Sequence, residues 1–167
     1  KKQLDMTLNA IISSNSLTGN PLSNRTVPSI NSPKAQLGMD LFFSKTLGGE
    51  YDSACVACHH PVLGGGDNLS LPIGVEADTP DLLGPGRTNN NAAHNHEGGP
   101  PVPRNAPTTF NVVAWDKFQF HDGRVESLDK TPGANGAGGS GIRTPDSALG
   151  EADPLAGNNL VHAQARF

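Results

Sequence analysis

The stretch Cys55-Val56-Ala57-Cys58-His59 decides how the rest of this 167-residue chain is interpreted. Its two cysteines are the only ones in the chain, and a histidine directly follows the second. This C-x-x-C-H pattern is the attachment motif of haem c, in which both thiols bond to the porphyrin and the histidine ligates the iron. The sequence therefore predicts one covalent haem c, attached at Cys55 and Cys58, with His59 as the proximal iron ligand.

Three other kinds of cysteine site account for the C-x-x-C-H pattern less well than haem attachment does. A thioredoxin-like redox pair needs its C-x-x-C at the start of a long helix in a βαβ context, which the surrounding sequence does not indicate. A structural zinc site requires four ligands, and the chain has no second cysteine pair. A disulfide between Cys55 and Cys58 leaves His59 without a role.

Composition and charge exclude several classes of protein. The chain has 20 Gly and 14 Pro residues and only 5% aromatic residues, which predicts long loops around a small core. Its formal net charge of −4 offers no basic surface for a phosphate backbone, so we expect no nucleic-acid partner. No apolar run is long enough for a membrane span, and the N-terminus lacks the apolar segment of an export signal.

The predicted elements are short helices separated by loops. An apolar stripe with helical spacing predicts a docking helix in the first dozen residues: Leu4, Leu8, Ile11 and Ile12. A second helix is expected to begin at Ser32 and Pro33, because serine caps a helix N-terminus and proline is tolerated in the first turn. Two further helices are expected within residues 105–115 and 124–130. Residues 63–105 are rich in Gly, Pro and Asn and predict a long loop.

The second axial ligand of the haem distinguishes an electron carrier from an enzyme. Small electron-transfer cytochromes place a methionine after the haem motif, but Met6 and Met39 both precede it. Histidines remain available downstream of the motif. Two of them, His94 and His96, lie in a Gly- and Asn-rich loop that is able to fold over a haem.

Four short segments of the sequence occur in an order that is typical of one protein family. They are Leu37–Phe43, the haem motif, Pro103–Thr108, and Phe120–Arg124 with Ser127 and Leu128. With these segments the chain resembles the bacterial di-haem cytochrome c peroxidases and the related MauG-like proteins. The resemblance implies a periplasmic protein of two cytochrome c-like domains, each with one haem c. The N-terminal haem of such a protein reacts with hydrogen peroxide, and the C-terminal haem receives electrons from a small donor protein, a cytochrome or a cupredoxin.

We therefore expect an all-α fold, with a cytochrome c-like domain of short helices and long Gly-, Pro- and Asn-rich loops at residues 32–130. Residues 1–31 are expected to hold the docking helix and an extended loop. Residues 131–167 are expected to be a flexible linker towards a second haem domain that is absent, because a second C-x-x-C-H does not occur. The chain is then either a fragment or a one-haem relative, with its export signal already removed.

The resemblance implies roles for further residues. The peroxidases have a distal histidine shortly before an Arg-Asn pair, and we expect His96 to be that iron ligand, with His94 as second choice. Asn105 matches a residue that contributes to a calcium site. Gln119 matches a glutamine of the distal pocket, and Asp129 falls where the family has an acidic residue near the peroxide.

The chemistry of peroxide cleavage requires a group that moves a proton between the two oxygens and a polar donor for the leaving hydroxide. We expect Asp129 to be the acid–base group and Gln119 or Arg104 to be the donor. Trp115, the only tryptophan, lies in the segment that the family places between its haems, and it either carries a hole transiently or packs as an ordinary aromatic. Two alternatives stay open: a single-haem electron-transfer or haem-sensing module without turnover, and a MauG-like enzyme that oxidises a partner protein.

Overall fold

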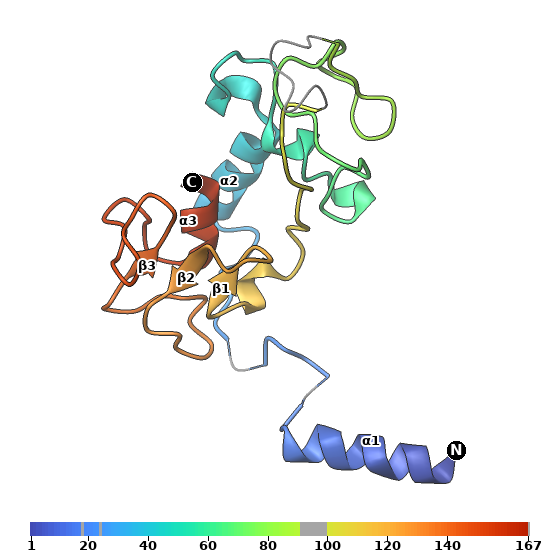
Figure 1. The fold of residues 1–167 in the computed structure, drawn as a ribbon, viewed down its shortest axis with the longest axis vertical. Coiled ribbons are helices and arrows are strands. Elements are labelled where there is room, and N and C mark those ends of the chain that lie inside the picture. The colour runs from blue at the N-terminus through green and yellow to red at the C-terminus, as the bar shows by residue number, and fades with distance from the viewer. Residues whose placement is uncertain (18, 24, 91–99, 167) are drawn as a thin grey trace. The chain divides into compact units, whose positions relative to one another are not determined.

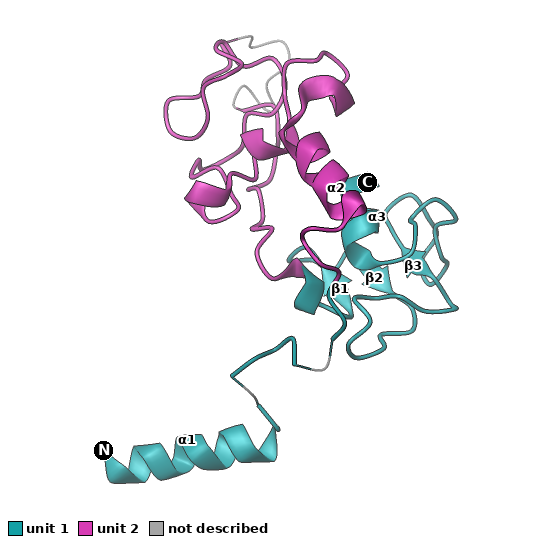
Figure 2. Ribbon diagram, turned by 180° about the vertical axis from the view of Figure 1, so that it is seen from behind, with its two compact units in different colours: residues 1–27, 113–167 teal, residues 28–112 magenta. Residues whose placement is uncertain are grey.

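The structure, a computed structural model, describes residues 1–17, 19–23, 25–90 and 100–166. It divides into two compact units, shown in different colours in Figure 2. Unit 2 is the continuous stretch of residues 28–112, and unit 1 combines residues 1–27 with residues 113–167. The boundaries after residues 27 and 112 differ from those suggested by the sequence, which fell after residues 31 and 130.

Unit 2 carries the C-x-x-C-H motif on short helical turns joined by loops (Figure 1). Its α-helix, α2, begins as predicted, with the Ser32 hydroxyl accepting a hydrogen bond from the Ala35 N–H at 3.3 Å and Pro33 in the first turn. Helix α2 contacts the turn that carries the motif. The described helices of this unit are α2 (Pro33–Phe43), η1 (Lys45–Leu47), η2 (Cys55–Ala57) and η3 (Pro61–Leu63), and a further turn, η5 (Val112–Ala114), leads into unit 1.

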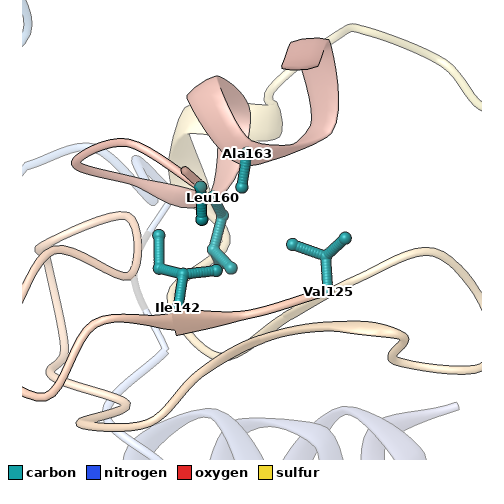
Figure 3. Packing of buried hydrophobic residues seen from close by; sticks show 5 residues of the cluster. Val125, Ile142, Leu160 and Ala163 are labelled. Atoms are coloured by element: carbon teal, nitrogen blue, oxygen red, sulfur yellow. The ribbon is translucent and has the colours of Figure 1, made fainter. Parts of the chain in front are cut away.

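Unit 1 is built around a small antiparallel sheet in the order β1-β2-β3. The strands are β1 (Phe118–Gln119), β2 (Val125–Ser127) and β3 (Ile142–Arg143). The C-terminal helix α3 (Leu160–Arg166) packs against this sheet. Figure 3 shows the side chains of the core that lies between them, which consists of Val125, Ile142, Ala156, Leu160 and Ala163. Residues 131–167 thus contribute a strand and a helix to the core of this unit.

The expectation of an all-α fold is wrong, because the described residues form a three-stranded sheet as well as three α-helices. The stretch expected as a helix at residues 124–130 contains β2, in which Val125 and Ser127 are buried and Glu126 is only half-buried. Buried and less buried side chains alternate in this way along a β-strand, but three residues are too few for the pattern to be recognised in a sequence. The helix expected within residues 105–115 is only the turn η5, since Asn111 adopts a left-handed conformation (φ 59°) that no α-helix contains.

The first helix is confirmed as α1 (Lys2–Ser14), and its apolar residues Leu4, Leu8, Ile11 and Ile12 are all exposed. Within the described ranges, no helix has both the length and the apolar character needed to cross a membrane.

A half-buried ion pair joins the N-terminal segment of unit 1 to its other part. Arg25 binds Asp116 through both ends of its guanidinium, with Nη1–Oδ1 at 2.8 Å and Nη2–Oδ2 at 2.6 Å. Asp116 also accepts the backbone N–H groups of Gly133 and Asn135, each at 2.8 Å. The hydrogen bond from Arg25 is the main reason why the pKa of Asp116 falls to about 2, although burial opposes it. The pair therefore ties three chain segments together.

Replacing Asp116 by asparagine is expected to lower the free energy of unfolding by about 2 kcal/mol near neutral pH. Folding lowers the pKa of this carboxyl from 3.8 to about 2. The contribution of this carboxyl to the free energy of unfolding is therefore complete at pH values above its pKa in the unfolded state. It is lost as the pH falls from 3.8 towards 2. Urea denaturation of the wild type and Asp116→Asn at several pH values checks this, because their difference should vanish in acid.

A control is Asp81→Asn, whose exposed ion pair with Lys45 should contribute almost nothing. A difference between wild type and Asp116→Asn that stays constant down to pH 2 would show that the ion pair does not stabilise unit 1.

Candidate haem-binding site

The C-x-x-C-H motif forms one tight helical turn. The Cys55 carbonyl accepts hydrogen bonds from the backbone N–H groups of both Cys58 (3.2 Å) and His59 (3.0 Å). Residues three and four positions apart lie on the same face of such a turn. The turn therefore places two free thiols one helical turn apart, with the imidazole next to the second of them.

Two backbone carbonyls hold the His59 ring. Its Nδ1 lies 2.9 Å from the carbonyl oxygen of Pro107 and 3.2 Å from that of Gly65. Since a carbonyl oxygen only accepts hydrogen bonds, Nδ1 must carry the proton and donate it. The lone pair is then on Nε2, which is the nitrogen that an iron needs. The donor set of this turn, two thiols and one oriented imidazole, therefore fits a haem c.

A turn of three glycines, Gly64–Gly66, is hydrogen-bonded to the residue that follows the motif. The backbone N–H of His60 donates to the Gly66 carbonyl at 2.8 Å, and the N–H of Gly65 donates back to the His60 carbonyl at 2.9 Å. The carbonyl of Gly65 also accepts the backbone N–H of Thr109 at 3.2 Å. The glycine turn thus connects the motif to the segment that provides the Pro107 carbonyl.

The surroundings of Cys58 favour a thiol over a thiolate. Its neighbours Val56 and Ala57 are buried, and Cys58 itself is half-buried. Burial is the main cause that raises the pKa of the Cys58 thiol to about 11, and the charge of Asp67 raises it further. A catalytic redox cysteine has a lowered pKa instead, so this environment speaks against a thioredoxin-type role.

Unit 2 has a small apolar core for its size. Its buried apolar side chains, among the residues described, are Val56, Ala57, Ile73 and Ala77, together with the fully buried Pro72. Larger apolar side chains of the same unit are exposed: Leu37, Phe43, Leu47, Val62, Leu82 and Phe110. A porphyrin is a large apolar group whose burial would cover such surface and stabilise the unit.

The other predicted site residues of unit 2 lie in the segment before Pro107. Arg104 is exposed. Asn105 is also exposed, and its side-chain nitrogen donates to the Ser70 carbonyl at 3.2 Å. The two candidates for the distal iron ligand, His96 and His94, lie outside the described residues.

The remaining predicted residues belong to unit 1 and occupy different parts of it. Gln119 lies in β1 with 3% of its surface exposed, and its Nε2 is buried without a partner among the described residues. Asp129 is exposed and accepts two hydrogen bonds from Ser140, from the hydroxyl at 2.7 Å and from the backbone N–H at 2.8 Å. The hydrogen bond from the Ser140 hydroxyl is the main cause that lowers the pKa of Asp129, and the bond from the backbone N–H adds to it. Asp129 is therefore ionised at neutral pH. Trp115 is exposed, and its carbonyl accepts a hydrogen bond from Asn135 at 2.8 Å.

Two buried charged residues close to the motif were not anticipated from the sequence. Asp67 is 1% exposed and Arg87 is 2% exposed, and both charges affect the Cys58 thiol. An acidic residue directly after three glycines, Gly64–Gly66, is a signal that could have pointed to Asp67. Arg87 lies in a loop without periodicity and carries no comparable signal. No group of three or more His, Cys, Asp or Glu side chains in the described part of the chain is arranged to hold a metal ion.

The glycine turn provides a matched pair of substitutions. Gly64 and Gly65 both have positive φ angles, 74° and 78°, so an alanine at either position should cost about 1 kcal/mol of strain. A Cβ at Gly65 would also lie 2.9 Å from the backbone N of Thr109 and from the hydroxyls of Thr108 and Thr109, whereas one at Gly64 meets nothing within 4 Å. Urea denaturation is expected to show that Gly65→Ala loses about 1–3 kcal/mol more than Gly64→Ala. Equal losses would contradict the supporting role of this turn.

Comparison with known proteins agrees with the resemblance seen in the sequence. The family model described as di-haem cytochrome c peroxidase matches residues 32–138. Cytochrome c551 peroxidase of Pseudomonas aeruginosa is 30% identical over 112 residues, which are 67% of this chain and 23% of that protein. Cytochrome-c peroxidase IdrP2 of a Pseudomonas species is 28% identical over 99 residues, which are 59% of this chain and 21% of that protein.

The chain spans less than a quarter of the length of these two relatives. No solved structure matches it. The family match nevertheless covers more than half of the chain and includes the whole haem motif with the segment that holds His59. The chain therefore belongs to the di-haem cytochrome c peroxidase family.

Proposed function

We propose that this chain is a haem c oxidoreductase domain that reduces hydrogen peroxide with electrons from a second haem or from a donor protein. The observation that carries the proposal is the orientation of His59, whose Nδ1 donates to two backbone carbonyls and whose Nε2 is available for an iron. Both relatives described above are named cytochrome c peroxidases, which supports the same reaction for this chain.

In this proposal Cys55 and Cys58 hold one haem through thioether bonds, and the Nε2 of His59 binds its iron. The haem supplies one-electron redox chemistry and the place where peroxide reacts. His96 is the proposed iron ligand on the opposite face, with His94 as the alternative.

Reduction of hydrogen peroxide to two water molecules consumes two electrons and two protons, so the site needs proton carriers. Gln119 is the proposed donor to a peroxide oxygen, because its buried Nε2 has no partner among the described residues. Asp129 is the proposed acid–base group, and since it is ionised, it begins as a proton acceptor that must release its bonds to Ser140. Arg104, an exposed cation, is the alternative donor to the leaving hydroxide.

We further propose a periplasmic location, a small cytochrome or cupredoxin as electron donor, and a calcium ion near Asn105. Calcium prefers oxygen ligands. The side-chain nitrogen of Asn105 is already engaged by the Ser70 carbonyl, which leaves its amide oxygen for such an ion.

The first test concerns attachment of the haem. Chain produced in a host that attaches haem c should keep its porphyrin in acidified organic solvent, and its mass should exceed that of the polypeptide by one haem. The double variant Cys55→Ala/Cys58→Ala should lose this covalent haem. His59→Ala should change the absorption spectrum, whereas the neighbouring His60→Ala, whose Nδ1 accepts the Val62 N–H, should not. Haem that is fully extracted from the wild type would refute the proposal.

The second test concerns turnover. Alone, the chain is expected to consume peroxide slowly and with damage to itself, because its single haem would donate one electron from the iron, whereas reduction of peroxide to water takes two. Adding a polypeptide that carries a second haem should restore turnover, and Gln119→Met should then lower it by about 10²-fold. Gln3→Met, in the exposed helix α1, is the control and should have no effect. Rapid and sustained turnover by the isolated chain would instead indicate a complete one-haem enzyme.

A further inference from the structure

Asp67 is the least exposed carboxylate of the described residues, with 1% of its surface accessible. Its Oδ1 accepts the backbone N–H of Leu69 at 3.0 Å, while its buried Oδ2 has no hydrogen-bond partner in the described part of the chain. Burying a carboxylate with an unsatisfied oxygen is costly in free energy. The residue therefore does more than close the turn at Leu69, since that turn uses only one of its oxygens.

The backbone places Asp67 beside the haem motif. His60 and Gly66 form an antiparallel bridge, in which the His60 N–H donates to the Gly66 carbonyl at 2.8 Å. Asp67 directly follows Gly66 and His59 directly precedes His60, so the two residues lie next to the bridge on its two antiparallel segments. The carbonyl of Gly65, which lies two residues before Asp67, faces Nδ1 of His59 at 3.2 Å. The position of Asp67 is thus fixed by the same turn that orients the proximal histidine.

No ion pair neutralises Asp67 among the described residues, although a buried cation lies in the same unit. Arg87 is 2% exposed and directs its guanidinium to four backbone carbonyls, those of Ile73, Gly74, Pro80 and Leu82, at 2.6–2.9 Å. These carbonyls, and not the Asp67 carboxylate, are the hydrogen-bond partners of the Arg87 guanidinium. The carboxylate of Asp67 is therefore buried next to the motif without a paired cation among the described residues.

A haem iron carries one more positive charge in its ferric state than in its ferrous state. A fixed negative charge in a poorly solvated place stabilises the ferric state, because little water screens the attraction. We propose that the buried carboxylate of Asp67 lowers the reduction potential of the haem held by Cys58 and His59. This inference rests on the proposed haem binding. In the one-electron couple the ferric iron gains an electron from an external reductant and becomes ferrous, and no bond is formed or broken.

For the proposed reaction, a lower reduction potential would favour electron transfer from the haem to peroxide. A lower potential makes the ferrous haem a stronger reductant, so it gives its electron to peroxide more readily. Asp67 would act only through its charge, by changing the reduction potential of the haem. It would not be a catalytic residue, because it contacts neither substrate nor reacting atoms.

The experiment is a potentiometric titration of the haem-bearing chain, followed by its absorption spectrum. Asp67→Asn removes the charge but keeps an oxygen that accepts the Leu69 N–H, and its midpoint potential is expected to shift to a more positive value. Asp67→Glu retains the charge and should stay closer to the wild type. Asp81→Asn is the matched control, because the Asp81 side chain is 88% exposed and paired with Lys45, so its removal should leave the potential unchanged. If the asparagine variant does not accumulate, Asp67→Ser is neutral, can still accept the Leu69 N–H, and should show the same positive shift.

An unchanged or more negative potential in the neutral variants would overturn the inference. An equal shift in Asp81→Asn would overturn it too, because the effect would then reflect net charge and not the buried position. A haem-loaded chain with an unmoved potential contradicts only the role of Asp67, whereas a chain that binds no haem contradicts the proposed function and this inference together.

Discussion

The proximal side of the site depends on the hydrogen bond from His59 Nδ1 to the backbone carbonyls of Pro107 and Gly65. This interaction fixes the ring in space, and it also fixes the tautomer that leaves Nε2 for an iron. Both acceptors are backbone atoms, so their positions depend on the path of the chain. The Gly65 carbonyl stays in place because it also accepts the Thr109 N–H, and because a glycine allows the left-handed turn and the close approach there. The motif provides the candidate ligands, but the imidazole of His59 is oriented by one nearby turn, at Gly65, and one segment distant in the sequence, at Pro107.

The two units are stabilised in different ways. Unit 1 has a core in which side chains of β2, β3 and α3 meet, and an ion pair between Arg25 and Asp116 that joins three of its segments. Unit 2 buries few apolar side chains and relies on hydrogen bonds to the backbone, of which Arg87 alone makes four. A unit of this kind gains a large share of its stability from a bound apolar group, because the group supplies the buried surface that its own side chains lack. We therefore expect folding of unit 2 to be coupled to haem binding more strongly than folding of unit 1.

The sequence predicts those parts of the structure that depend on local patterns. Helix α2 begins at the expected cap, Ser32, and α1 follows the apolar spacing of the first dozen residues. The strands escaped prediction because each has only two or three residues, too few for an alternating pattern to be recognised, and because their pairing depends on residues distant in the chain. The Pro107 carbonyl could not be found either, since every residue has a carbonyl and only the fold selects the one that meets His59. The catalytic assignments of Gln119 and Asp129 rest on the resemblance, and they stay predictions.

Burial of Asp67 and Arg87 has opposite effects on stability and on electrostatic function. A charge that is removed from water costs free energy, and the four carbonyls around Arg87 recover part of that cost with hydrogen bonds. Asp67 recovers less, because one of its oxygens has no partner among the described residues. The burial of this carboxylate also limits the screening of its charge near the haem motif, whereas the charge of exposed Asp81 is screened by solvent and by Lys45. A hydrogen-bond donor that satisfied the second oxygen of Asp67 would make unit 2 more stable and would weaken the field at the same time. The unsatisfied oxygen is thus consistent with a residue whose charge, and not its contribution to stability, explains its position.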